Sequence, residues 1–98
     1  MVLKEIIAAL ENTTHPVAKA LHKGEHFKVL AIGFKKGMIL KEHKAYLPTK
    51  LFVLSGQVTY TENAIATALS AYEEIEIPIN CLHSVIAVAD SLCLLTQG

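Results

Sequence analysis

Residues 26–69 read HFKVLAIGFKKGMILKEHKAYLPTKLFVLSGQVTYTENAIATAL, and this stretch decides the fold. Val, Ile and Thr are frequent in it, and turn residues such as Lys36-Gly37, Leu47-Pro48 and Ser55-Gly56 divide it into short runs. Runs of this kind are typical of β-strands. We therefore predict strands over residues 26–34, 38–46, 50–55, 57–62 and 64–69, and further strands over residues 73–77, 83–88 and 91–96.

The N-terminal segment has a different periodicity. Its apolar residues recur at the spacing of one helix face: Leu3, Ile6, Ile7 and Leu10. Asn12 to Pro16 then end the pattern. We predict a helical segment within residues 1–15 and a β-barrel over residues 26–96. Because no helical pattern lies between the strands, the fold class is all-β, a closed antiparallel barrel or a sandwich rather than a βαβ sheet.

Several predicted strands are apolar on both faces, including Val29 to Ile32 and Ser84 to Ala89. Both faces of such strands need cover, which a barrel interior combined with a dimer interface would provide, or an overlying sheet. A plain sandwich core is the alternative. Since a domain of this size cannot cover so much apolar surface alone, we expect a homodimer.

Length and composition limit the possible functions. The 98 residues suit one domain, residues 1–98, and exclude an enzyme with separate cofactor and substrate lobes. The formal net charge is +0 and all the basic residues are lysines. Without arginine the chain lacks the bidentate group that most often reads phosphate and guanine. We expect no nucleic acid among its partners.

We also expect no membrane partner and a cytoplasmic location. The most apolar stretch, Ile77 to Ala89, is interrupted by Asn80 and His83 and is too short to span a bilayer. Lys4 and Glu5 stand where a signal peptide needs an apolar core. The two cysteines, Cys81 and Cys93, are too few for a disulfide framework and are interpreted as buried, reduced thiols.

Two spaced patterns carry a resemblance to a known family. The first is Gly37-x5-His43-x-Ala45-x3-Thr49-x6-Gly56, and the second is Tyr72-x5-Pro78-x-Asn80-x2-His83-x3-Ala87. They are similar to the cupin motifs G-x5-H-x-H-x3-E-x6-G and G-x5-P-x-G-x2-H-x3-N. The resemblance covers about residues 26 to 96 and implies an antiparallel jelly-roll barrel with a short N-terminal helix.

The resemblance also implies a metal site, which this chain has in part only. The family's three histidines and one glutamate bind first-row metals, because imidazole and carboxylate suit such ions. Here His43 and His83 match, whereas Ala45 replaces the second histidine and Thr49 replaces the glutamate. Tyr72, Asn80 and Ala87 replace the Gly, Gly and Asn of the second motif. We expect no resident cofactor, and a divalent transition metal would be held only weakly.

The remaining histidines have two interpretations. His43 and His83 are either a relic pair, hydrogen-bonded to each other, to Thr49 or to water, or ligands of a metal that recruits a substitute donor. Cys81 is the available substitute, but a lone cysteine is more often core filling. The other histidines, His15, His22 and His26, have no spacing signal and are expected at the surface.

The predicted function follows from this broken ligand set. We expect a small-molecule-binding or non-catalytic cupin-like barrel with a degenerate metal site, whose partner is a small apolar ligand oriented by two imidazoles. The alternative is a metal-dependent enzyme, such as a dioxygenase or isomerase, that uses His43 and His83 with a substitute ligand. A third possibility is a structural dimerisation protein. The predicted pocket is formed by His43, Ala45, Thr49, Leu51, Val53, His83, Val85 and Ala87.

Overall fold

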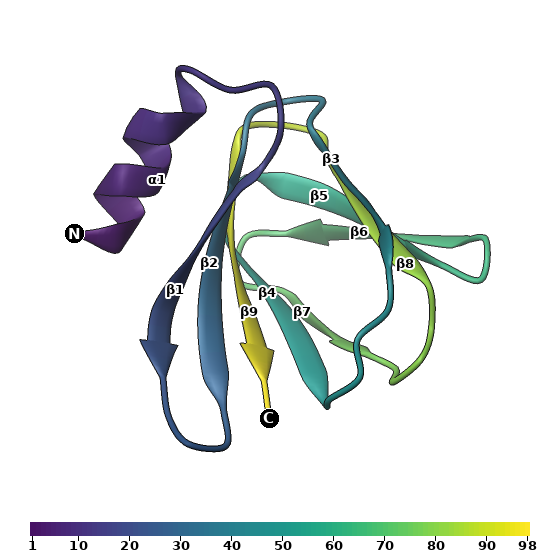
Figure 1. Cartoon of the computed structure of the whole chain (residues 1–98). Coiled ribbons are helices and arrows are strands. Elements are labelled where there is room, and N and C mark those ends of the chain that lie inside the picture. Colours follow the sequence, from purple (N-terminus) through teal and green to yellow (C-terminus); the bar gives the residue numbers. More distant parts are fainter.

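Two antiparallel sheets face each other in the computed structural model, which describes residues 1–98 (Figure 1). The five-stranded sheet has the order β1-β2-β9-β4-β7, and the four-stranded sheet has the order β3-β8-β5-β6. The elements are α1 (Val2–Leu10), β1 (Val17–Lys23), β2 (Lys28–Phe34), β3 (Ile39–His43), β4 (Thr49–Ser55), β5 (Gln57–Glu62), β6 (Ile65–Ser70), β7 (Glu74–Ile77), β8 (His83–Ala87) and β9 (Ser91–Gln97).

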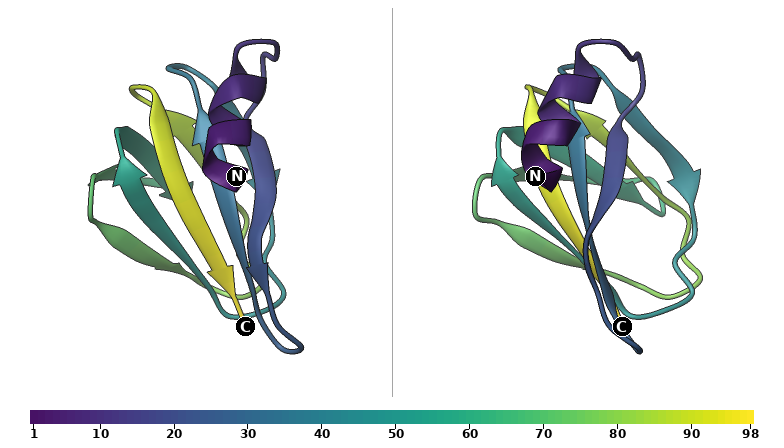
Figure 2. Two further views of the ribbon diagram at one scale, coloured as in Figure 1. Left: turned by 90° about the vertical axis from the view of Figure 1, so that its left-hand side faces the viewer. Right: turned by 60° about the vertical axis from the view of Figure 1, so that its left-hand side comes forward.

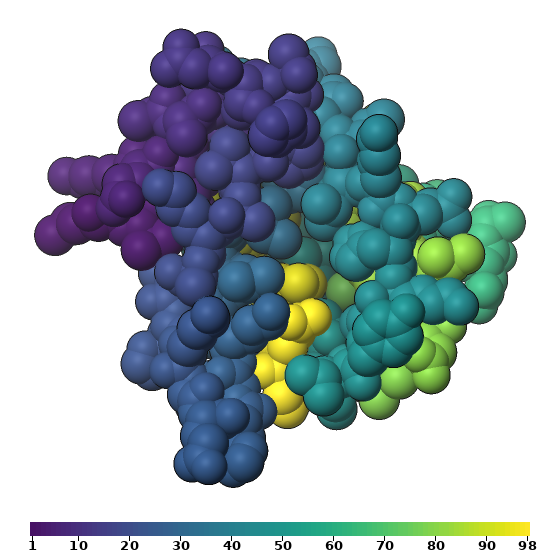
Figure 3. Space-filling view, viewed as in Figure 1, coloured from purple at the N-terminus to yellow at the C-terminus, as the bar shows by residue number.

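The core lies between the two sheets and is built from alternate residues of each strand. Leu51 and Val53 of β4 and Val85 of β8 belong to it, and all three side chains are about 1% exposed. Strand alternation sends the intervening residues, such as Lys50 and Phe52, to the outer face. Since β9 is the middle strand of the larger sheet, its inward Cys93 is fully buried. The outer atoms of the C-terminal segment, in yellow, are visible at the surface in the space-filling view (Figure 3).

Helix α1 packs against the outer face of the larger sheet, over β1 and β2 (Figure 2). Ile6 and Leu10 are the buried residues of the helix, as its periodicity predicts, whereas Ile7 stays 56% exposed. The helix can approach closely because β2 has Gly33 beneath it, where a Cβ atom would meet the Ile6 and Leu10 side chains. At nine residues, α1 is too short to cross a lipid bilayer, and the structure has no other helix.

The predicted strands are confirmed, with ends that shift by a few residues. The largest shift is in β3, which ends at His43 instead of residue 46 because the chain turns away toward β4. Residues 17–23 form a strand that the sequence did not predict, and the helix ends at Leu10 well before residue 15. Strand β1 is an edge strand whose residues are nearly all exposed, so it lacks the apolar alternation that identifies buried strands.

Candidate functional site

The two motif histidines lie side by side on the inner face of the smaller sheet. Backbone pairing places His43 of β3 opposite His83 of β8, and His83 opposite Glu62 of β5. The rings of His43 and His83 have centroids 4.1 Å apart. On the other side, the ring of Tyr60 stacks on His83 at 5.8 Å. Glu62, His83 and His43 thus form one row across three neighbouring strands. We call it the acceptor row, because a carboxylate and the free nitrogen of a neutral imidazole both accept hydrogen bonds.

The backbone fixes the orientation of both imidazoles. Nδ1 of His43 lies 2.9 Å from the carbonyl oxygen of Lys41, and Nδ1 of His83 lies 3.2 Å from that of Cys81. Because a carbonyl oxygen only accepts, Nδ1 carries the proton in each ring and Nε2 is left with a lone pair. A backbone carbonyl on the second ring nitrogen is also how proteins orient histidines that bind ligands through Nε2.

The surroundings of His83 favour the neutral form of its ring. Burial, more than any other influence, lowers the pKa of His83, and the nearby His43 lowers it further against the opposing effect of the Cys81 carbonyl. No buried side-chain nitrogen or oxygen atom lacks a hydrogen-bond partner. Since Nε2 of His83 makes no hydrogen bond, that atom retains contact with solvent. The residue as a whole is only 2% exposed.

Strand β5 adds two side chains that motif reasoning missed. The buried Tyr60 hydroxyl donates a hydrogen bond of 2.9 Å to Oε1 of Glu62, and the Cys81 thiol lies 3.6 Å from Oε2. Burial and the Glu62 carboxylate both raise the pKa of Tyr60. The alternation Val58-x-Tyr60-x-Glu62 placed these residues on one strand face, and this signal could have identified them.

The other predicted site residues are buried but less directly engaged. The Thr49 hydroxyl donates to the carbonyl oxygen of Leu47 at 2.8 Å and bonds to neither histidine. Ala45 forms an isolated bridge with Ile79, where the amide of Asn80 donates to the Ala45 carbonyl at 2.8 Å. The apolar members each lie on the inner side of their strand and are at most 2% exposed: Leu51, Val53, Val85 and Ala87.

The donor set does not fit a cupin-type metal. No three side chains among the histidines, cysteines and acids are arranged to hold an ion. Cys81 is half-buried, which differs from its predicted burial, and burial with the Glu62 carboxylate raises the pKa of its thiol, so the thiolate form that binds metals is disfavoured. Both cysteines are free, as predicted, and burial raises the pKa of Cys93 to about 12.

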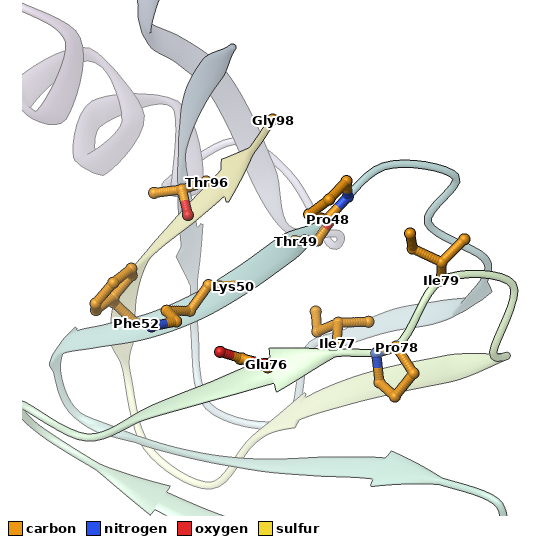
Figure 4. Close-up of a pocket in the computed structure, with 10 residues that line it drawn as sticks. All are labelled: Pro48, Thr49, Lys50, Phe52, Glu76, Ile77, Pro78, Ile79, Thr96 and Gly98. Carbon is orange, nitrogen blue, oxygen red and sulfur yellow. The ribbon is translucent and has the colours of Figure 1, made fainter.

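The main surface depressions lie away from the histidines. One, of about 650 Å³, lies along the outer side of β4 and β7 and includes Thr49 (Figure 4). Two others lie beside α1 and at the β1–β2 turn. None of these three is lined by His43 or His83. The use of the barrel end that carries the histidines as a ligand pocket stays a prediction.

The backbone supports the alignment with both motifs. Gly37 and Gly56 have φ of +86° and +87°, so each is a turn that favours glycine. Tyr72 and Asn80 stand where the second motif has glycines, and they keep φ of 72° and 61°. The turns of the motif are thus present even where the glycine is not.

Among comparisons with known proteins, only the one with solved structures finds similar proteins, and several of these are cupins. No protein-family model and no curated protein matches the chain. An RmlC-like cupin from Desulfovibrio desulfuricans has a TM-score of 0.77 and 26% identity, over 84% of this chain and 80% of its own. A cupin superfamily protein from Desulfitobacterium hafniense has a TM-score of 0.79 and 16% identity, over 94% of this chain and 86% of its own. KdgF from Halomonas sp. has a TM-score of 0.77 and 17% identity, over 88% of this chain and 81% of its own. The predicted resemblance is confirmed: the chain has the cupin fold, which supports its assignment to the cupin family.

Proposed function

With the cupin fold as the premise, we propose that this protein is a non-catalytic barrel that binds a small, largely apolar molecule through His43 and His83. The observation that carries the proposal is the anchoring of both Nδ1 atoms on backbone carbonyls, which leaves an Nε2 lone pair on each of two rings whose centroids are 4.1 Å apart.

The chemistry of the acceptor row limits the chemical class of the ligand. Its two Nε2 atoms and the Glu62 carboxylate accept hydrogen bonds, while the nearby Tyr60 and Cys81 groups already donate to Glu62. A ligand with a hydroxyl group therefore fits this end of the barrel better than an anion. The neighbouring walls are aliphatic, so the rest of the ligand is apolar.

The ligand enters by way of the loops beside the histidines. The segments that follow β3 and precede β8 are joined by the hydrogen bond from Asn80 to Ala45. Opening this bond would widen access to His83, which is 2% exposed when the bond is closed. Two free thiols are what a reducing compartment preserves, which supports the cytoplasm as the place of action.

Ligand-observed NMR with phenol as the probe tests the proposal. Phenol has one donor hydroxyl and an apolar ring, and we expect saturation transfer from the wild-type protein to its ring protons. The transfer should be lost in His43→Ala and in His83→Ala and kept in His15→Ala, which removes an exposed histidine. Equal transfer to phenol from all four proteins would contradict the assignment of the site, and no transfer from the wild type would contradict the ligand class.

A further inference from the structure

Three connecting segments lie together at one end of the barrel, the lower end in Figure 1 and in both views of Figure 2. They join β1 to β2, β3 to β4 and β7 to β8, and with the flanking lysines of the first they are residues 23–28, 44–48 and 78–82. Leu47 lines a depression of about 550 Å³ together with Phe27, and Ala45 forms a bridge with Ile79. The middle segment therefore lies beside both of the others. We call these three segments the loop end.

Large apolar side chains are exposed in every segment of the loop end. Phe27, Tyr46, Leu47 and Ile79 are each between 47% and 74% exposed. Phe27 lies in the β1–β2 turn, which the amide of Gly24 closes by donating to the Phe27 carbonyl at 2.8 Å. This turn projects beyond the rest of the loop end (Figure 1). Aromatic and aliphatic side chains at such projecting positions are suited to the boundary between water and lipid.

The charged side chains of the loop end are mostly basic. They are Lys23, Lys28 and Lys44 with one acid, Glu25, which gives a formal charge of +2 in a chain whose net charge is +0. The remainder of the chain therefore carries −2. None of the three lysines forms an ion pair in this structure. The positive charge of the loop end is thus left for a partner to neutralise.

Two of these lysines face each other across the hairpin. Lys23 of β1 pairs with Lys28 of β2, and like charges directly opposite each other on neighbouring strands are unfavourable. Both lysines line the depression of about 550 Å³, where Phe27 and Leu47 supply an apolar wall. An anion beside the two ammonium groups would relieve their repulsion. The hollow therefore suits an anionic group that is attached to an apolar body.

We propose that the loop end docks on the surface of an anionic lipid bilayer, with Phe27 and Leu47 in the headgroup region and Lys23 and Lys28 at the lipid phosphates. A free anion would neutralise the lysines but would leave the apolar side chains in water. Because the apolar side chains project from three separate loops, a deformable lipid surface covers them more readily than a folded protein. The expectation of no membrane partner concerned a segment that crosses the bilayer, and docking at its surface needs none.

The docking proposal is independent of the ligand function, since it rests on the loops and not on the histidines. It has a consequence for that function, because β3 ends at His43 and β8 begins at His83. The docked protein would hold the acceptor row at the end that faces the lipid. An apolar molecule with one hydroxyl group partitions into bilayers, so docking would bring the barrel to its ligand.

Co-sedimentation with vesicles tests the proposal. At low salt we expect the wild type to sediment with phosphatidylglycerol vesicles and not with phosphatidylcholine vesicles, and about 0.5 M NaCl should release it. Lys23→Gln with Lys28→Gln should weaken the association about 25-fold, since each lysine near an anionic surface contributes about a factor of five. Lys4→Gln with Lys36→Gln is the matched control, because it removes the same charge from two exposed lysines outside the loop end. It should bind nearly as tightly as the wild type.

Fluorescence gives a second measurement that does not depend on disruption. The chain has no tryptophan, so Phe27→Trp introduces a single reporter. Its emission should shift to shorter wavelength when phosphatidylglycerol vesicles are added. Tyr72→Trp is the control, because Tyr72 is exposed in a turn outside the loop end, and its emission should not move. Circular dichroism checks that each variant is folded.

Three results would overturn the proposal. The first is a wild type that stays in solution with phosphatidylglycerol vesicles, and the second is equal weakening by the two pairs of lysine substitutions. The third is a shift of the Phe27→Trp emission by inorganic phosphate or by polyglutamate that is as large as the shift by vesicles. Inorganic phosphate would then indicate a site for a free anion, and polyglutamate would indicate an acidic protein as the partner.

Discussion

The turns of the two cupin motifs are kept in this chain, whereas the metal-ligand residues of the same motifs are only half kept. All four turn positions keep the left-handed backbone, at Gly37, Gly56, Tyr72 and Asn80, and two of them do so with a side chain. At the metal-ligand positions, Ala45 and Thr49 stand where the motif has a histidine and a glutamate, so two donor side chains are missing. We therefore predict that the barrel folds through its turns without a metal, so that the fold and the metal chemistry can be separated.

The largest effect is expected at a turn. Gly56→Ala places a Cβ at φ +87° against the Asp90 carbonyl and the Ser91 side chain, so both strain and a clash result. We expect a loss of about 3 kcal/mol in the free energy of unfolding, measured by urea denaturation. Gly37→Ala is the control, because its Cβ would meet nothing within 4 Å and only the strain remains. Equal losses in both variants would show that packing at Gly56 is unimportant.

The next effect is expected at the acceptor row. Tyr60→Phe removes the hydroxyl that donates to Glu62 and leaves the carboxylate, which is half-exposed, to be satisfied by water. We expect a loss of about 1.5 kcal/mol, at the lower end for hydrogen bonds to charged groups. Tyr46→Phe, at a tyrosine that is 74% exposed, should change nothing. If Tyr60→Phe is as stable as wild type, the hydrogen bond to Glu62 contributes nothing to the fold.

Acid should destabilise the protein through His83. Burial lowers the pKa of His83 in the folded chain, so below its ordinary value of about 6.5 the unfolded chain binds the extra proton. The free energy of unfolding should then fall between pH 7 and pH 5, by at most about 1.4 kcal/mol per pH unit for this one proton. Urea titrations of wild type and His83→Gln measure this. A slope that is the same in both proteins would assign the effect to another group.

The smallest effect is expected at a turn that has lost its glycine. Tyr72 is 92% exposed at φ 72°, so its ring contributes little packing while its Cβ is strained. We expect Tyr72→Gly to raise the free energy of unfolding by about 0.5–1 kcal/mol, since glycine adopts this conformation without a steric penalty. Tyr72→Phe should leave stability unchanged. Destabilisation by Tyr72→Gly would mean that the ring has a partner.

The sequence predicted the barrel better than it predicted the site. Strands such as β5 have visible alternation and short turns, so their extents followed from local chemistry. Strand β1 was missed because an exposed edge leaves no apolar pattern. The motifs predicted that His43 and His83 lie together. They did not predict that Glu62 lies beside His83, because that position is set by the register of β5 on β8. Register between distant strands depends on packing across the whole sheet and is not encoded locally.

The same limit applies to the thiols. Cys81 and Cys93 were both expected to be buried, and only Cys93 is, because Cys81 lies in the loop that precedes β8. The position of a loop residue depends on which strand lies beside it, here β5 with Glu62.

Titration with a metal tests the separation of fold from metal chemistry most directly. Isothermal titration with Ni(II) or Zn(II) should show no tight binding to the wild type, because two imidazoles without a third strong donor form a weak chelate. Ala45→His with Thr49→Glu restores the missing donors and should bind about one ion per chain, and adding His83→Ala to that variant should abolish binding. Tight binding of one ion per chain by the wild type would contradict the account and favour the metal-dependent enzyme.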